Sequence, residues 1–158
     1  MRSKNRRLAC GTAKRLIDGV VRRCDEVNAS GEFIESVARA WLFGSCARGE
    51  QRPHDVDICL QLDRRPHGVC GQEWVQTSIR FAEESGREFR SFMDMIYWPT
   101  TSLLRKVRGG SVALSIHIYH DTEKIVYDHP ETTMIYECEN LKGIVADPLG
   151  KPFTGVWQ

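Results

Sequence analysis

The chain has 158 residues, a length that predicts one domain with a real hydrophobic core and leaves no room for a second catalytic domain. Its 22 lysines and arginines almost balance 21 aspartates and glutamates, so nucleic acid and membrane surfaces are not favoured as general partners. The basic start lacks the apolar core of a signal peptide, and no run has the length of a membrane span. We therefore expect a cytoplasmic protein with a flexible segment at 1–11.

The first predicted element is an amphipathic helix. Apolar residues recur at spacings of three and four over 12–27, which is the helical period. The sequence breaks at 28–31, and the apolar run at 37–43 then predicts a strand that ends at Gly44. A helix and a strand therefore precede the first polar turn.

Two carboxylates open the second predicted strand. We expect a short helical turn at 47–51, which Pro53 ends, and then a strand at 55–62. Because side chains alternate along a strand, Asp55 and Asp57 share one face. Two adjacent acids repel each other, and hard oxygen ligands at this spacing favour Mg²⁺ over zinc as the cation between them.

A Gly-Ser turn lies just before these acids in the chain. Gly44 and Ser45 would leave backbone N–H groups free at a helix start, where phosphate binds well. Since the two predicted strands are neighbours, the turn and the acids face each other. A metal and a phosphate in one small unit indicate nucleotide chemistry.

A single acid interrupts the next apolar run. After a helix predicted at 72–84, the residues 89–98 are interpreted as a strand in which apolar side chains surround Asp94. Such a carboxylate either reaches solvent or an arginine at the end of the sheet, or it is a third metal ligand beside Asp55 and Asp57. The upstream pair of acids favours the ligand.

The remaining elements complete an α+β pattern. The residues 101–107 predict a short helix, whereas 111–119 alternate like a strand and equally fit a buried helix. A strand is predicted at 124–127, and a β-hairpin or small meander at 132–158. Helices and strands alternate early and strands cluster late, which predicts a mixed sheet flanked by helices.

Cysteines and histidines form no convincing metal site in the sequence. The six cysteines include no Cys-x-x-Cys pair, so we expect reduced thiols, and the spacing of Cys59, His67 and Cys70 is too loose for zinc. His117 and His120 lack a third ligand of matching spacing and are interpreted as surface histidines.

These residues form one motif: an apolar strand that ends in Gly44-Ser45, a spacer of nine residues, and then Asp55-Val56-Asp57. The motif resembles that of the nucleotidyltransferase superfamily with a polymerase-β-like palm, in its minimal form. The Ala-Arg-Gly at 47–49 is also similar to the family pattern, and Asp94 is similar in position to the family's third acid on a later strand. The resemblance covers roughly residues 12–128.

This resemblance implies how the chain is organised. It implies a nucleotidyltransferase domain at 1–128 and a C-terminal β-hairpin extension of the same domain at 129–158. The segment 108–128 is similar to the one that closes many minimal members, a helix leading into a short strand. By that comparison the ambiguous stretch at 111–118 starts as helix.

The resemblance also implies a reaction. Two Mg²⁺ ions held by Asp55, Asp57 and Asp94 would bridge a nucleoside triphosphate and an attacking hydroxyl, so that a nucleoside monophosphate, most commonly AMP from ATP, is transferred and pyrophosphate leaves. Gly44 and Ser45 would bind the β- and γ-phosphates.

Two alternatives stay open at the loop and at the tail. Arg48 either contacts a phosphate or braces the loop by an ion pair. The apolar tail either forms an interface with a partner or completes the chain's own sheet. Its residues are Met134, Ile135, Tyr136, Phe153, Val156 and Trp157.

The acceptor of the nucleotide is not encoded in any readable motif. Either a helical protein partner or a homodimer completes the acceptor site, or the acceptor is a small hydroxylated molecule such as an aminoglycoside. A small molecule of that kind would need acidic residues beside the metal site, and Glu50, Asp63 and Asp121 are available. The rival interpretation is a catalytically silent nucleotide-binding or regulatory module that acts through a protein partner.

Overall fold

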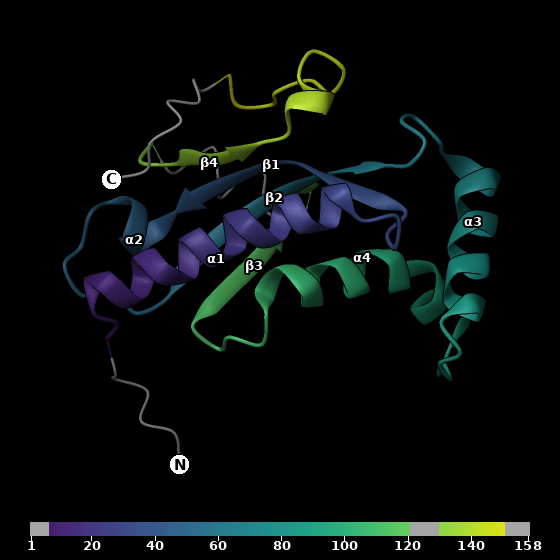
Figure 1. The fold of residues 1–158 in the computed structure, drawn as a ribbon, viewed down its shortest axis with the longest axis horizontal. Coiled ribbons are helices and arrows are strands. Elements are labelled where there is room, and N and C mark those ends of the chain that lie inside the picture. The colour runs from purple at the N-terminus through teal and green to yellow at the C-terminus, as the bar shows by residue number, and fades with distance from the viewer. Residues whose placement is uncertain (1–6, 121–129, 151–158) are drawn as a thin grey trace.

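The computed structural model describes residues 7–120 and 130–150 and shows four strands and four α-helices there (Figure 1). The helices are α1 (Cys10–Ala29), α2 (Gly44–Ala47), α3 (Gly71–Glu84) and α4 (Phe92–Arg108), and a 3₁₀ turn, η1, covers Glu139–Leu141. The strands are β1 (Glu35–Phe43), β2 (Val56–Arg64), β3 (Leu114–Ile118) and β4 (Thr133–Glu137).

The four strands form one mixed sheet in the order β3-β2-β1-β4. Strand β1 is antiparallel to both of its neighbours, whereas β2 and β3 run parallel. The predicted α+β class with a mixed, helix-flanked sheet is therefore confirmed. In the described part of the chain, no helix has the length and apolar character needed to cross a membrane.

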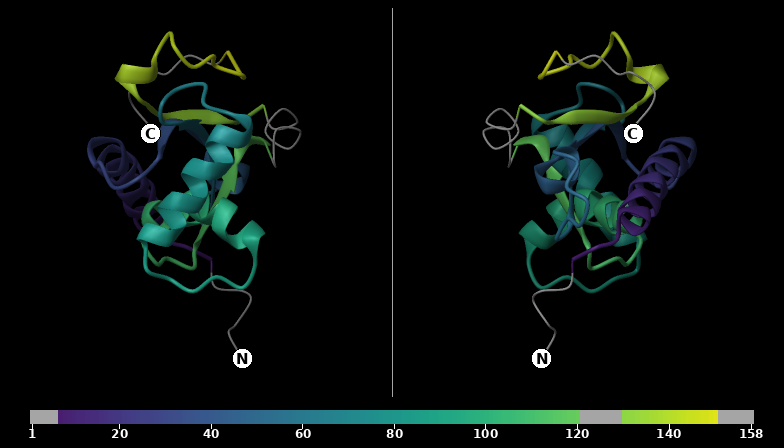
Figure 2. Two further views of the ribbon diagram at one scale, coloured as in Figure 1. Left: turned by 90° about the vertical axis from the view of Figure 1, so that its right-hand side faces the viewer. Right: turned by 90° about the vertical axis from the view of Figure 1, so that its left-hand side faces the viewer.

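The two faces of the sheet carry different clusters. Helices α1 and α4 cover one face, where Ile17, Leu103 and Val107 pack against buried residues of β1 and β2. A smaller cluster that includes Trp41 and Tyr119 lies on the other face. Figure 2 shows the C-terminal segment, in yellow, on the side of the sheet away from α4. Strand β1 is thus buried on both faces, which explains why its sequence is mostly apolar without strict alternation, with Arg39 as the charged exception between Val37 and Phe43.

A buried arginine attaches the C-terminal segment to the sheet. Arg39 is only 4% exposed, and its Nε lies 2.9 Å from Glu137 Oε2 on β4. Its Nη1 donates to the Gln61 side chain and to the carbonyl of Val145. A charge with this many partners stays paired in the interior, so the segment is fixed against β1 and β2.

The tail completes the chain's own sheet. Met134, Ile135 and Tyr136 are buried on β4, beside β1, so these three residues do not form an exposed interface. After β4, the described residues contain η1 and an isolated bridge between Lys142 and Val145 rather than a second strand. The C-terminal hairpin is therefore wrong as far as residue 150, and Phe153, Val156 and Trp157 lie outside the described residues, as does the strand predicted at 124–127.

The strand predicted at 89–98 is wrong. These residues enter α4, which begins at Phe92 and runs on through the predicted helix at 101–107. Ser91 caps the helix by accepting a hydrogen bond from the backbone N–H of Asp94, and Gly109 ends it in the left-handed conformation. The cap outweighs the β-propensity of the aromatic residues.

Two further boundaries differ from the sequence analysis. The short helical turn begins at Gly44 itself, as α2, and does not wait until 47–51. The ambiguous stretch at 111–118 contains strand β3 and no helix, so the helical start implied by the resemblance is also wrong. Strand β3 pairs with β2, and this long-range pairing settles a local pattern that fitted both structures.

Candidate active site

The candidate site lies where β1 ends and β2 begins. Phe43, the last residue of β1, is the register partner of Asp57 on β2. Gly44 follows Phe43 directly and starts α2, so the Gly-Ser turn and the two acids meet at one end of the sheet, as predicted. In Figure 1 this end, marked by α2, is opposite the end marked by α3.

Gly44 lies unusually close to the Asp57 carboxylate. Its φ of +76° is a conformation that side-chain-bearing residues avoid. A Cβ built at this position would lie 2.7 Å from Asp57 Oδ2, which is too short for a real contact. Gly49 has the same φ of +76° but open space around it. At Gly44, therefore, glycine is required both by the backbone and by the acid.

The alternation along β2 directs Asp57 away from the helices. Val56 and Ile58 are fully buried in the core that α1 and α4 cover, whereas the Asp57 side chain is 23% exposed on the other face. Asp55 is half-buried and stands two residues earlier, just before β2 begins. Ser45 is half-buried in α2.

Strand β3 brings two further polar groups to Asp57. Ser115 is its register partner, and His117 lies two residues on, on the same face. His117 Nε2 is 2.9 Å from Ser115 Oγ and 3.9 Å from Asp57 Oδ1, and its ring is tilted against Phe43. The interpretation of His117 as an ordinary surface histidine is therefore wrong. The alternating pattern at 114–118 indicates that Ser115 and His117 share one face of a strand. It does not indicate that this strand pairs with β2 beside Asp57.

Asp94 is not part of this site. It lies in the first turn of α4 and lines a pocket together with residues of the α3–α4 connection. The later strand beside Asp57 is β3, and it carries Ser115 and His117 where the resemblance led us to expect an acid. Within 7–120 and 130–150, no three His, Cys, Asp or Glu side chains are grouped so as to hold a metal ion. The three-carboxylate arrangement is therefore not formed by Asp94.

Arg48 braces the loop. Its guanidinium lies 3.0 Å from Glu50 Oε1 and 3.2 Å from Glu131 Oε1. The hydrogen bond to Glu50, assisted by the one to Glu131, raises the pKa of Arg48 above its ordinary value. Of the two alternatives for this residue, the structure shows the ion pair, and it connects the α2 loop to the segment before β4.

Cys59, His67 and Cys70, whose spacing in the sequence is too loose for zinc, have other surroundings in the structure. All six cysteines are free, and Cys59 is fully buried in the Trp41 cluster, on the face of the sheet away from α1 and α4. His67 instead pairs with Asp63 at 2.8 Å. Near the site, burial raises the pKa of the Cys46 thiol, and the charge of Asp57 adds to the effect. Cys46 is therefore a protonated core residue rather than a ligand.

The donor set fits one magnesium ion better than two. Two carboxylates, from Asp55 and Asp57, are hard oxygen ligands, and Mg²⁺ is commonly bound by one or two carboxylates together with substrate phosphates. A second ion held by the protein would need the additional carboxylate that β3 lacks. The Asp57 carboxylate itself fills the space that a Cβ of Gly44 would occupy, so this acid lies directly against the Gly-Ser turn.

Comparison with known proteins gives one match. Residues 24–98 match a family model described as "Nucleotidyltransferase domain". The matched segment runs from within α1 to within α4 and includes Gly44, Ser45, Asp55 and Asp57. No curated protein and no solved structure matches the chain.

Proposed function

We propose that this chain, whose residues 24–98 match a nucleotidyltransferase domain, transfers AMP from ATP to a hydroxyl acceptor, with release of pyrophosphate. The observation that carries the proposal is the contact of Gly44 with Asp57, which joins a phosphate-binding turn to a metal-binding acid. Strand pairing fixes both, so the site is held by the rigid part of the fold.

The Gly-Ser turn is the proposed phosphate site. The β- and γ-phosphates would bind at the backbone N–H groups of this turn, while the space that a Cβ of Gly44 would fill is taken by the Asp57 carboxylate. The hydroxyl and the N–H of Ser45 donate hydrogen bonds to them from the first turn of α2. Arg48 is occupied by two glutamates and is left out of this phosphate site.

Asp55 and Asp57 are the proposed ligands of a magnesium ion that arrives with the triphosphate. When bound, such an ion neutralises charge on the α-phosphate and lowers the pKa of the acceptor hydroxyl. His117 and Ser115 are proposed as positioning residues, because their hydrogen bond places a ring nitrogen 3.9 Å from the Asp57 carboxylate. They stand where the family pattern has its third acid.

One observation favours the rival function, a nucleotide-binding module without turnover. Among the described residues, β3 supplies no carboxylate beside Asp57. Loss of one acid is a simple way to abolish catalysis at such a site while nucleotide binding remains. The two functions differ in whether the protein has an acceptor for the nucleotide. The candidate acceptors are a helical protein partner, a second copy of the chain and a small hydroxylated molecule.

The experiment is a transfer assay with ATP labelled at the α-phosphate. The protein is incubated with Mg²⁺, the labelled nucleotide and separate acceptors: itself, RNA, purified proteins and aminoglycosides. The proposal predicts a labelled product that is lost in Asp57→Asn and retained in Arg48→Gln. Nucleotide binding that needs Asp57, without transfer to any acceptor, would instead establish the silent module.

A further inference from the structure

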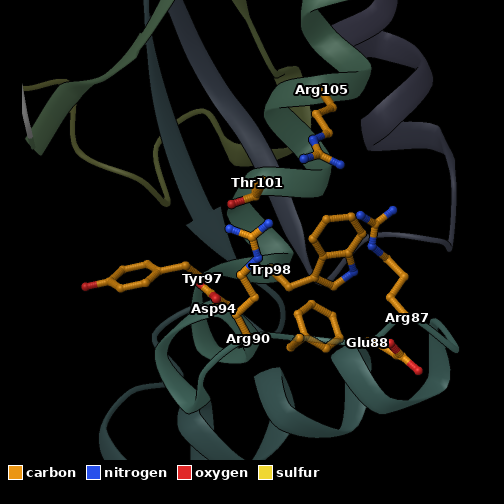
Figure 3. Close-up of a pocket in the computed structure, with 9 residues that line it drawn as sticks. Arg87, Glu88, Arg90, Asp94, Tyr97, Trp98, Thr101 and Arg105 are labelled. Atoms are coloured by element: carbon orange, nitrogen blue, oxygen red, sulfur yellow. The ribbon is translucent and has the colours of Figure 1, made fainter.

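A pocket lies apart from the candidate active site, and its lining contains none of Gly44, Ser45, Asp55 and Asp57. It has a volume of about 360 Å³ and opens between the α3–α4 connection and α4, with its lining extending along the helix from Asp94 to Arg105 (Figure 3). The C-terminal end of α4 leads to β3, which begins beside Val56. The residues that line the pocket belong to the α3–α4 connection and α4, and none of them is a residue of the candidate active site.

Three arginines surround a tryptophan in this pocket. The guanidinium carbon of Arg87 lies 4.3 Å from the centre of the Trp98 ring, and that of Arg105 lies 5.4 Å from it. Figure 3 shows the guanidinium group of Arg90 on a further side of the same ring. Stacking holds a guanidinium by its face and leaves its N–H edge free to donate to an anion.

The positive charge of these arginines is not neutralised by ion pairs. In the described part of the chain, none of the three forms an ion pair with a carboxylate; the ion pairs of other arginines there are recorded at Arg22, Arg39 and Arg48. Glu88 and Asp94 also line the pocket, but in Figure 3 the Glu88 carboxylate points away from the tryptophan. Three cations against two acids leave the pocket positive.

Exposed aromatic surface adjoins the positive charge. Five large apolar side chains are strongly exposed in the described residues, and three of them, Phe92, Met93 and Tyr97, lie in the first two turns of α4. Tyr97 is 60% exposed and lines the pocket itself. A planar ring beside arginine forks is the combination that holds a base and its phosphate together.

We infer that this pocket is a second binding site, for a nucleoside phosphate. The phosphate lies among Arg87, Arg90 and Arg105, and the base stacks on Tyr97. A free nucleotide and a nucleotide within single-stranded RNA present the same chemistry. The balanced charge of the whole chain does not oppose this, because the positive charge is local. The inference does not depend on the proposed transferase site.

The test is a calorimetric titration of the full chain without divalent ions, with AMP in one arm and a short oligo-uridylate RNA in the other. Binding in either arm is expected to weaken about tenfold in Arg105→Gln and in Arg87→Gln, because each removes a charged hydrogen bond to phosphate. Arg80→Gln, an exposed arginine of α3 outside the pocket, is the matched control and should bind like the wild type. Asp57→Asn should also bind normally, which separates this site from the transferase site.

Two further variants locate the ligand. Trp98→Phe should abolish the change in tryptophan fluorescence on binding while calorimetric binding persists. Tyr97→Ala, at an exposed position where folding is not at risk, should weaken binding about fivefold or more by removing the stacking surface. Binding in the AMP arm identifies a free-nucleotide site, and binding in the RNA arm alone identifies a strand site. Absence of binding in both arms, or binding that the Arg105, Arg87 and Tyr97 variants leave unchanged, would overturn the inference.

Discussion

A methyl group added at Gly44 should damage the candidate active site more than the fold. In Gly44→Ala the new Cβ would lie 2.7 Å from Asp57 Oδ2 and 3.5 Å from its Cγ. The carboxylate is the movable partner, so it shifts by several tenths of an ångström to restore a normal contact. The positive φ adds a strain of about 1–2 kcal/mol, which lowers the Tm by roughly 2–8 °C in a protein of this size.

Gly49→Ala is the control for this strain. Gly49 has the same φ, but a Cβ there meets nothing within 4 Å. Both variants should therefore lose similar stability in thermal unfolding. Only Gly44→Ala should weaken binding of Mg²⁺ and a non-hydrolysable ATP analogue in calorimetry, by about 10–100-fold, the usual effect of displacing a metal ligand through its neighbours. Equal nucleotide affinity in the two variants would refute the role assigned to the contact between Gly44 and Asp57.

Three other predictions concern separate parts of the molecule. Asn28→Ala should lower the free energy of unfolding by roughly 2–4 kcal/mol in urea titrations, because Asn28 bonds both backbone groups of Val37 and the hydroxyl of Tyr136; a loss below about 0.5 kcal/mol would contradict this. Burial raises the pKa of the Glu35 carboxyl above its ordinary 4.5. The protonated carboxyl therefore contributes its full share to the free energy of unfolding below pH 4.5, and this contribution is lost as the pH rises through the folded-state pKa. Glu35→Gln should therefore gain stability relative to the wild type from acid to neutral pH, and a constant difference would argue against the raised pKa. Ser115→Asp, which places a carboxylate opposite Asp57, should tighten Mg²⁺-dependent nucleotide binding about tenfold, and weaker binding would show that β3 does not face the metal.

Elements with a strong local pattern were predictable from the sequence. The helical period at 12–27 and the apolar run at 37–43 gave α1 and β1 nearly to their ends, and α1 extends only two residues further on each side. The Gly-Ser turn and Asp57 could be brought together in advance because antiparallel neighbours must place them at the same end. The proximity of the Gly-Ser turn to Asp57 was therefore predictable from the order of two neighbouring strands.

The errors occurred where distant contacts decide the structure. The first turns of α4 expose Phe92, Met93 and Tyr97, so apolar residues fall on all sides of the helix and its period is hidden. Asp94 was assigned to the metal site because residues 89–98 were predicted to be a strand. Since these residues enter helix α4 instead, that assignment was wrong as well. His117 was missed for a related reason, because its proximity to Asp57 depends on parallel pairing across more than fifty residues, which no local pattern reveals.

The site at the Gly-Ser turn can be tested most directly by a crystal structure of the protein with Mn²⁺ and a non-hydrolysable ATP analogue. The anomalous signal of manganese locates the ion independently of the protein coordinates. Our account predicts a peak between the carboxylates of Asp55 and Asp57, with the β- and γ-phosphates at Gly44 and Ser45. A triphosphate bound elsewhere in the protein, with no manganese at Asp57, would contradict it.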